Sequence, residues 1–188
     1  MTMRMKKIIS FMAVAATMLL TACDGHQDFP DTAMKVGHIL CTDGKTMSYE
    51  DYQTSGKQAI AVVFNINQSE EMEGNGYAVY LWDIAPEVFA DSMGVNQKTS
   101  ADLSAYDGNT NTFALYSAKN VRSPLAMSVV DLWRYGQSAY IPTVAQMRLL
   151  YHAKNAINPL IVKCGGTPIP DEDDDCWYWT STDRKSVV

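Results

Sequence analysis

The chain has few cysteines, little positive charge and no motif of a common catalytic site. Its 15 lysine and arginine residues are outnumbered by 21 aspartate and glutamate residues, which gives a formal net charge of −6. No basic stripe is available to neutralise phosphates, so nucleic acid is excluded as an expected partner. The four cysteines are too few for a disulfide-dense scaffold and too far apart for a paired Cys-x-x-Cys zinc site.

Residues that would support catalysis are equally sparse. The sequence contains no Gly-x-Ser-x-Gly, P-loop or dinucleotide-binding glycine pattern. His26, His38 and His152 are scattered and lack the spacing of a metal site, so we interpret them as surface or structural residues. A length of 188 residues fits one domain plus a leader. The sequence therefore predicts a protein that is not an enzyme.

The first 22 residues have the pattern of a signal peptide. Basic residues between Arg4 and Lys7 precede an uncharged, mostly apolar stretch, Ile8–Leu20. That stretch is shorter than the ~20 residues that a membrane-spanning helix needs. The box that follows, Leu20-Thr21-Ala22-Cys23, resembles the lipobox of bacterial lipoproteins, in which the cysteine thiol takes diacylglycerol. We expect lipidation at Cys23; the alternative is a plain secretory signal followed by an incidental cysteine.

Cleavage before Cys23 would make the exported chain more acidic. The leader holds three basic residues and no acidic one, so its removal takes the net charge from −6 to −9. An acidic body would project away from an anionic membrane rather than lie on it. Residues 23–34 read as a polar tether. We therefore expect an outer-membrane lipoprotein of the cell envelope, displayed on the surface and held by its N-terminal lipid.

The body reads as strands followed by helices, which predicts an α+β fold. Ser48 is a candidate N-cap, and Thr143 with Gln146 forms a candidate capping box. Asp43-Gly44 and Asp107-Gly108-Asn109 are typical of turns. The patterns predict strands at Val36–Leu40, Ala59–Ile66, Gly76–Asp83 and Trp177–Thr182, a helical turn at Pro86–Met93, and helices at Ser48–Tyr52, from Pro124 to about Tyr135, from Val144 to about Tyr151 and from Asn158-Pro159 to Gly165-Gly166.

Several segments, taken in order, resemble a family of Bacteroidales surface lipoproteins. Their domain is of the DUF1566 or Lcl C-terminal-like type, related to the Fibrobacter major paralogous domain. The resemblance covers about Lys35 to Thr182. It lies in Val36-Gly37-His38-Ile39-Leu40, Asp43-Gly44, Ala59–Phe64, Asp107–Thr112, Tyr140-Ile141-Pro142-Thr143 with Met147, Leu149, Leu150 and Tyr151, and Tyr178-Trp179-Thr180-Ser181-Thr182.

This resemblance implies a C-type-lectin-like fold: a small mixed or antiparallel sheet with flanking helices. It also implies adhesion or ligand binding, and it carries over no catalytic residue. The family continues through further strands after the Tyr-Trp-Thr-Ser-Thr segment, whereas this chain stops at Val188. We therefore expect residues 35–182 to be a partial domain, incomplete at its C-terminus, and residues 183–188 to be a non-native tail.

Two candidate sites lie near the C-terminus. Carboxylates of Asp171, Asp173, Asp174 and Asp175 are candidate calcium ligands; the alternative is a solvated acidic loop, because the run lacks the spaced ligands of an EF-hand. Cys164 and Cys176 flank this run and are a candidate disulfide in an exported protein. The alternative is two unpaired buried thiols, and Cys41 is a competing partner for either one.

The aromatic residues allow two interpretations. Trp177 and Trp179 would share one face of a strand, so both would lie in the core, which we expect, or both on a surface that stacks sugars. The leading functional hypothesis is a surface-anchored binding or adhesion module for an extracellular glycan or protein. The alternatives are a structural envelope or fimbria-associated component and an enzyme of the formylglycine-generating type.

Overall fold

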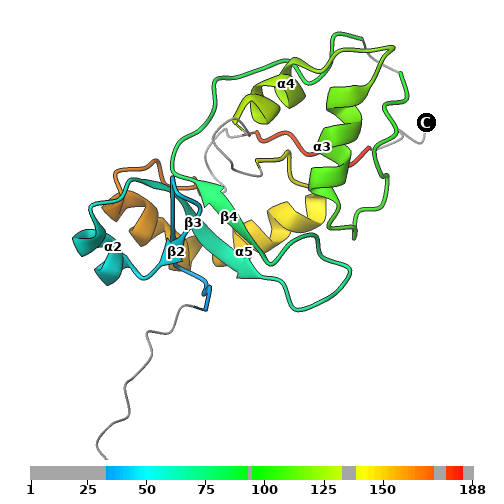
Figure 1. The fold of residues 1–188 in the computed structure, drawn as a ribbon. Coiled ribbons are helices and arrows are strands. Elements are labelled where there is room, and N and C mark those ends of the chain that lie inside the picture. The colour runs from blue at the N-terminus through cyan, green and yellow to red at the C-terminus, as the bar shows by residue number, and fades with distance from the viewer. Residues whose placement is uncertain (1–32, 93–94, 133–138, 172–176, 184–188) are drawn as a thin grey trace, which may run out of the picture. The chain divides into compact units, whose positions relative to one another are not determined.

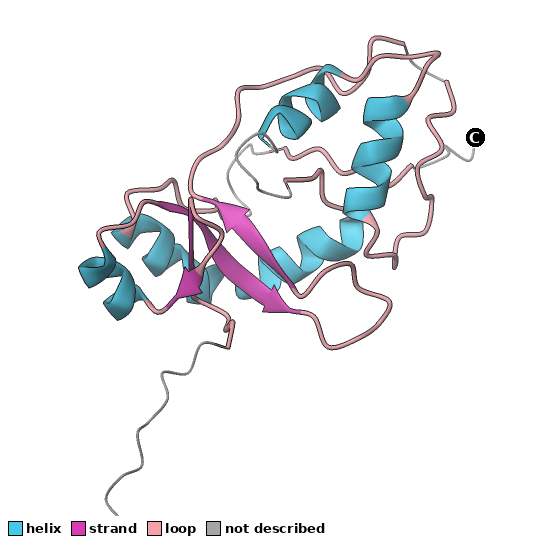
Figure 2. Ribbon diagram, in the orientation of Figure 1, coloured by secondary structure: helices cyan, strands magenta, loops and turns pink. Residues whose placement is uncertain are grey.

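The computed structural model describes residues 33–92, 95–132, 139–171 and 177–183 (Figure 1). Within these ranges the protein combines four helices with one four-stranded sheet, in which every neighbouring pair is antiparallel (Figure 2). The prediction of a small sheet combined with helices is confirmed. None of the helices in the described part of the chain is long and apolar enough to cross a membrane.

The sheet has the strand order β2-β1-β3-β4. Its longest strand, β3, has the predicted bounds, and its first six residues are buried, as expected for an apolar run between neighbouring strands. Gly44 adopts a φ of 78° in the turn that joins β1 to β2, which confirms the predicted Asp43-Gly44 turn. The strands are β1 (Ile39–Cys41), β2 (Thr46–Met47), β3 (Ala59–Ile66) and β4 (Gly76–Tyr80).

A serine or threonine side chain caps the N-terminus of three of the helices. Ser48 accepts a hydrogen bond from the Asp51 N–H, and Ser123 accepts one from the Ala126 N–H. Thr143 and Gln146 form the predicted capping box at the start of the longest helix. The helices are α2 (Tyr49–Ser55), α3 (Gly108–Ser117), α4 (Pro124–Asp131) and α5 (Val144–Lys163).

The predicted helix break before Pro159 is wrong. Helix α5 runs without interruption through Pro159, and it buries Ile157 and Ile161 on either side of the proline. Packing of these two residues on the sheet outweighs the lost backbone hydrogen bond. The neighbouring Asn158 binds the loop beyond the helix, since its amide bonds both the carbonyl and the N–H of Ile169 at 2.8 and 2.9 Å.

Five other predictions need correction. The strand predicted at Gly76–Asp83 ends at Tyr80. The first strand begins at Ile39 rather than Val36, after Gly37 with a φ of 87°. The predicted turn at residues 107–109 is instead the start of α3, with Asp107 in the N-cap position. No helix forms over the described residues 86–92, and no strand forms over residues 177–183. The last segment is held by isolated contacts, including a 2.8 Å hydrogen bond from the Ser181 N–H to the Pro142 carbonyl.

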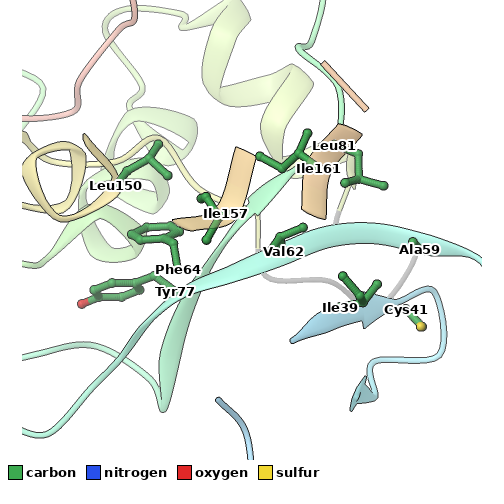
Figure 3. Packing of buried hydrophobic residues seen from close by; sticks show 10 residues of the cluster. All are labelled: Ile39, Cys41, Ala59, Val62, Phe64, Tyr77, Leu81, Leu150, Ile157 and Ile161. Atoms are coloured by element: carbon green, nitrogen blue, oxygen red, sulfur yellow. The ribbon is translucent and has the colours of Figure 1, made fainter. Parts of the chain in front are cut away.

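Two hydrophobic clusters form the core. The first lies between the sheet and α5, and it contains the residues shown in Figure 3: Ile39, Cys41, Ala59, Val62, Phe64, Tyr77, Leu81, Leu150, Ile157 and Ile161. The second joins α3 and α4 to the segment before α5, through Leu115, Leu125, Ala126, Val129, Ala139 and Ile141. Helix α4 thus buries Leu125 and Val129 on one face, while Trp133 lies outside the described residues.

Candidate ligand-binding cleft

A cleft of about 250 Å³ lies where the two hydrophobic clusters meet. Phe64 and Leu150 of the first cluster and Val129 and Ala139 of the second all contribute to its walls. Six of the residues that line it are aromatic, so we call it the aromatic cleft. Its aromatic residues are Phe64, Tyr80, Trp82, Tyr140, Tyr178 and Trp179.

Three of these rings remain open to solvent although they line a cavity. Trp82 is 49% exposed, Tyr178 45% and Trp179 57%. Large aromatic side chains normally bury most of their surface in a folded domain, so an exposed group of them around a hollow indicates a binding surface. The cleft is slightly smaller than the ~300–1,000 Å³ of pockets for drug-sized molecules, so it fits one ring of a larger ligand.

Two backbone hydrogen bonds of Leu81 join the segment that carries Trp82 to β3 and to the loop after α5. The Leu81 N–H donates to the Ile60 carbonyl at 3.0 Å, and the Leu81 carbonyl accepts from the Thr167 N–H at 2.7 Å. A side chain at Gly166 would meet the Leu81 carbonyl at 2.5 Å, so only glycine allows this close approach. Residues Thr167 to Ile169 are thereby placed in the cleft wall, beside the segment that carries Trp82.

A separate set of contacts positions Trp179. Its ring lies 5.3 Å from that of Phe89, centroid to centroid, at an interplanar angle of 45°. Two residues later the backbone is bonded to Pro142, and the Thr182 hydroxyl accepts a hydrogen bond from the Val144 N–H at 3.2 Å. The segment that carries Trp179 is therefore attached to the start of α5 without being part of the sheet.

The polar groups of the cleft are few and differ in availability. Gln146 is held by the structure, because its Oε1 accepts from the Thr143 N–H at 2.9 Å and its Nε2 donates to the Tyr106 carbonyl at 3.2 Å. Burial, reinforced by nearby Tyr77 and Glu73, raises the pKa of Tyr140, so its phenol stays protonated. Asp83 is exposed and makes no hydrogen bond within the described ranges, which leaves its carboxylate available to a hydroxyl donor.

The expectation that Trp177 and Trp179 share a buried face is wrong. Trp177 is 93% exposed and lies outside the cleft, whereas Trp179 lines it. The alternation argument fails because the segment is not a strand, so successive side chains do not point to opposite faces. The two tryptophans therefore have different surroundings although they are two residues apart.

The acidic run is only partly described. Asp171 accepts a 2.8 Å hydrogen bond from the Lys154 ammonium, whose side chain is 8% exposed and which also lies 4.5 Å from the centre of the Tyr151 ring. A calcium ion at Asp171 would therefore have to compete with a lysine. Asp173, Asp174 and Asp175 lie outside the described residues, so calcium at this run remains a prediction.

The candidate disulfide is also only partly described. Cys176 and Cys23 lie outside the described residues, and Cys41 and Cys164 are both present as free thiols. These two thiols belong to the same hydrophobic cluster. Burial raises the pKa of both thiols. The Asp43 carboxylate raises the pKa of Cys41 further, and Cys41 raises that of Cys164. The Cys164–Cys176 disulfide remains a prediction.

The described part of the chain holds no group of three or more histidine, cysteine, aspartate or glutamate residues able to bind a metal. His38 lies just before β1, His152 is exposed on α5 beside the Tyr151 ring, and His26 falls outside the described residues. Within the described ranges the structure brings none of the predicted lipidation, disulfide or calcium residues into the aromatic cleft, and of the two candidate tryptophans only Trp179 lines it. Comparison with family models, curated proteins and solved structures found no match for this chain.

The cleft was not predicted from the sequence, although part of its signal was present. Trp82 lies within the strand predicted at Gly76–Asp83, and Tyr178 and Trp179 form an aromatic pair after a loop. Sequence alone does not show that these segments meet, because 95 residues separate Trp82 from Tyr178 in the printed numbering.

Proposed function

We propose that this protein is a lipid-anchored binding module of the cell surface that takes a ring of an extracellular glycan into the aromatic cleft. The observation that carries the proposal is the exposure of Trp82, Tyr178 and Trp179 around one hollow. Sugar rings present apolar C–H faces that stack on aromatic side chains, and their hydroxyls need a few polar partners. The open Asp83 carboxylate is such a partner.

The dimensions of the cleft favour a glycan over a peptide segment. A cavity of about 250 Å³ holds one ring, and the aromatic walls suit a flat apolar face rather than an extended backbone. A peptide bound as an added strand would instead rely on a row of main-chain hydrogen bonds along a sheet edge. The array test below therefore includes host proteins as the alternative ligand.

Attachment by Cys23 and the lectin-like resemblance complete the proposal. The lipobox pattern supports a lipid anchor, and the net charge of −9 after cleavage supports a body held away from an anionic bilayer. The antiparallel sheet with flanking helices is compatible with a C-type-lectin-like domain. Catalysis is not proposed, because no nucleophile with an adjacent base is found among the described residues of the cleft.

The proposal is tested by a glycan-array screen of the full-length protein in detergent, with host-matrix proteins on the same slide. The wild type and the variants Trp82→Ala and Trp177→Ala are compared, with and without a calcium chelator. We expect glycan signals that Trp82→Ala abolishes and that Trp177→Ala retains, because Trp82 lines the cleft and Trp177 does not. Binding to matrix proteins alone, or to glycans equally in all three forms, would overturn it.

The anchor is tested separately. Metabolic labelling with a palmitate analogue should mark the wild type and not Cys23→Ala. Equal labelling of both would exclude lipidation at Cys23 while leaving the proposed ligand site untouched.

A further inference from the structure

A second and larger hollow lies beside α3, with a volume of about 570 Å³. One wall is a single face of α3, because Thr110, Phe113, Ala114 and Ser117 follow one another at helical spacing. The opposite face of this helix is buried, through residues such as Thr112 and Leu115. The other walls are the loop 96–98 and the segment 118–121. We call this hollow the α3 pocket.

The α3 pocket is basic in an acidic protein. Lys98 and Lys119 line it, and no aspartate or glutamate does. Neither ammonium group has an ion-pair partner among the residues that the structure describes. The Glu73 carboxylate at the N-terminus of α3 is already bound to the Asn109 and Thr110 N–H groups and to the Thr110 hydroxyl. The pocket can therefore hold a ligand anion.

An unsatisfied acceptor points to a ligand that also donates hydrogen bonds. The Gln97 Oε1 atom is buried and has no hydrogen-bond partner in the described part of the protein. A buried carbonyl oxygen without a donor is costly, so such a group in a cavity wall indicates a missing partner. Sulfate and the dianion of a phosphate monoester offer only acceptors, whereas a saccharide hydroxyl can donate to Gln97.

The loop that carries Gln97 is held in an unusual conformation. Lys98 has a φ of 60°, the only positive value for a non-glycine residue in the described ranges. Its N–H is fixed by a 2.8 Å hydrogen bond to Asn96 Oδ1. Backbone strain of this kind is often found where a side chain is positioned for binding. Across the pocket, Phe113 is 56% exposed and offers an aromatic face that the core does not use.

We propose that the α3 pocket binds an acidic saccharide unit, such as a sialic or uronic acid residue. Lys98 and Lys119 bind the carboxylate, Gln97 accepts from a ring hydroxyl, and Phe113 packs on the apolar face of the sugar. The proposal rests on the proposed function in taking the ligand to be a glycan, but it concerns a different site. An acidic unit here and a ring in the aromatic cleft would make the protein selective for charged glycans.

The test is calorimetric titration of the full-length protein in detergent with sialyllactose, trigalacturonate and an unsaturated chondroitin disaccharide, against lactose as the neutral control. Lys98→Gln and Lys119→Gln should each weaken binding of an acidic saccharide by about three- to tenfold, as expected for loss of one charge-assisted contact. Phe113→Ala should weaken it as well. The matched control is Lys45→Gln, which removes an exposed lysine from the turn between β1 and β2 and should change nothing.

The outcomes separate this proposal from the proposed function. If Lys98→Gln loses acidic saccharides while Trp82→Ala does not, the α3 pocket is supported whatever the cleft binds. If neutral and acidic saccharides bind equally, and only Trp82→Ala weakens them, the cleft is supported and the α3 pocket is overturned. Failure of all three acidic saccharides to bind the wild type would also overturn it.

Discussion

The Glu73 carboxylate is bound to Thr110 at the N-terminus of α3, thirty-seven positions further along the chain. It accepts from the Thr110 N–H at 3.2 Å, from the Asn109 N–H at 2.9 Å and from the Thr110 hydroxyl. Asp107, in the N-cap position, makes no such side-chain bond. A loop between β3 and β4 therefore supplies the cap that the helix lacks locally, and it links the sheet to α3.

Removing this long-range cap should destabilise the protein. Glu73→Ala leaves two N–H groups of α3 without an acceptor and takes a negative charge from the positive end of the helix. We expect a loss of about 1 kcal/mol in the free energy of unfolding, measured by urea denaturation. The control is Glu71→Ala, an exposed acid on the same loop. Equal stabilities of the two variants would show that the cap contributes nothing.

Gly108 should not tolerate a side chain. A Cβ atom there would lie 2.8 Å from Tyr140 Cδ2 and 2.9 Å from the Ile141 carbonyl oxygen, and it would also collide with Gln146. Gly108→Ala should therefore cost more than about 2 kcal/mol through overpacking. Gly56→Ala is the comparison, because it has open space and only a positive φ of 66°, so about 1 kcal/mol is expected. Thermal unfolding that ranks the two in the reverse order would contradict the packing described.

The Cys41 thiol should be protected in the folded protein. It is fully buried, and burial together with the nearby Asp43 carboxylate raises its pKa, so little thiolate is present at pH 8. In the reduced protein we expect iodoacetamide to modify Cys41 at least about tenfold more slowly than after unfolding. Peptide mapping by mass spectrometry reads out each cysteine. Fast modification of the folded form would place Cys41 at the surface.

Alkaline pH should unfold the protein partly through Tyr140. Burial raises its pKa in the folded state above the ordinary tyrosine value of about 10. The unfolded state therefore ionises first, so stability is complete below about pH 10 and falls as the pH rises further. Tyr140→Phe should flatten this decline, measured by urea denaturation between pH 8 and 11. An unchanged slope would mean that Tyr140 ionises freely in the folded protein.

The features that sequence predicted well are those with local causes. The β-branched run of β3, the Asp43-Gly44 turn, the Ser48 cap and the Thr143–Gln146 capping box all depend on residues within a few positions of one another. The start of α3 was missed because Asp107-Gly108-Asn109 is typical of a turn. The cap that makes it a helix comes from Glu73, which no local pattern reveals.

Non-local packing also explains the other failures. Pro159 stays inside α5 because Ile157 and Ile161 are buried against the sheet. Trp177 and Trp179 separate because their segment is held by Pro142 and Phe89 rather than by a neighbouring strand. The aromatic cleft joins β4, the start of α5 and two distant loops, so its residues could be named as aromatic from the sequence but not brought together.

The most direct test of the proposed function is an NMR titration that follows the indole N–H signals of the four tryptophans. The full-length protein in detergent micelles is titrated with the strongest saccharide from the array screen, and the signals are assigned with single Trp→Phe variants. We predict saturable shifts of the Trp82 and Trp179 signals, which line the cleft, and an unmoved Trp177 signal, because Trp177 lies outside it. Saturable binding that leaves both Trp82 and Trp179 unmoved would contradict the assignment of the cleft as the glycan site.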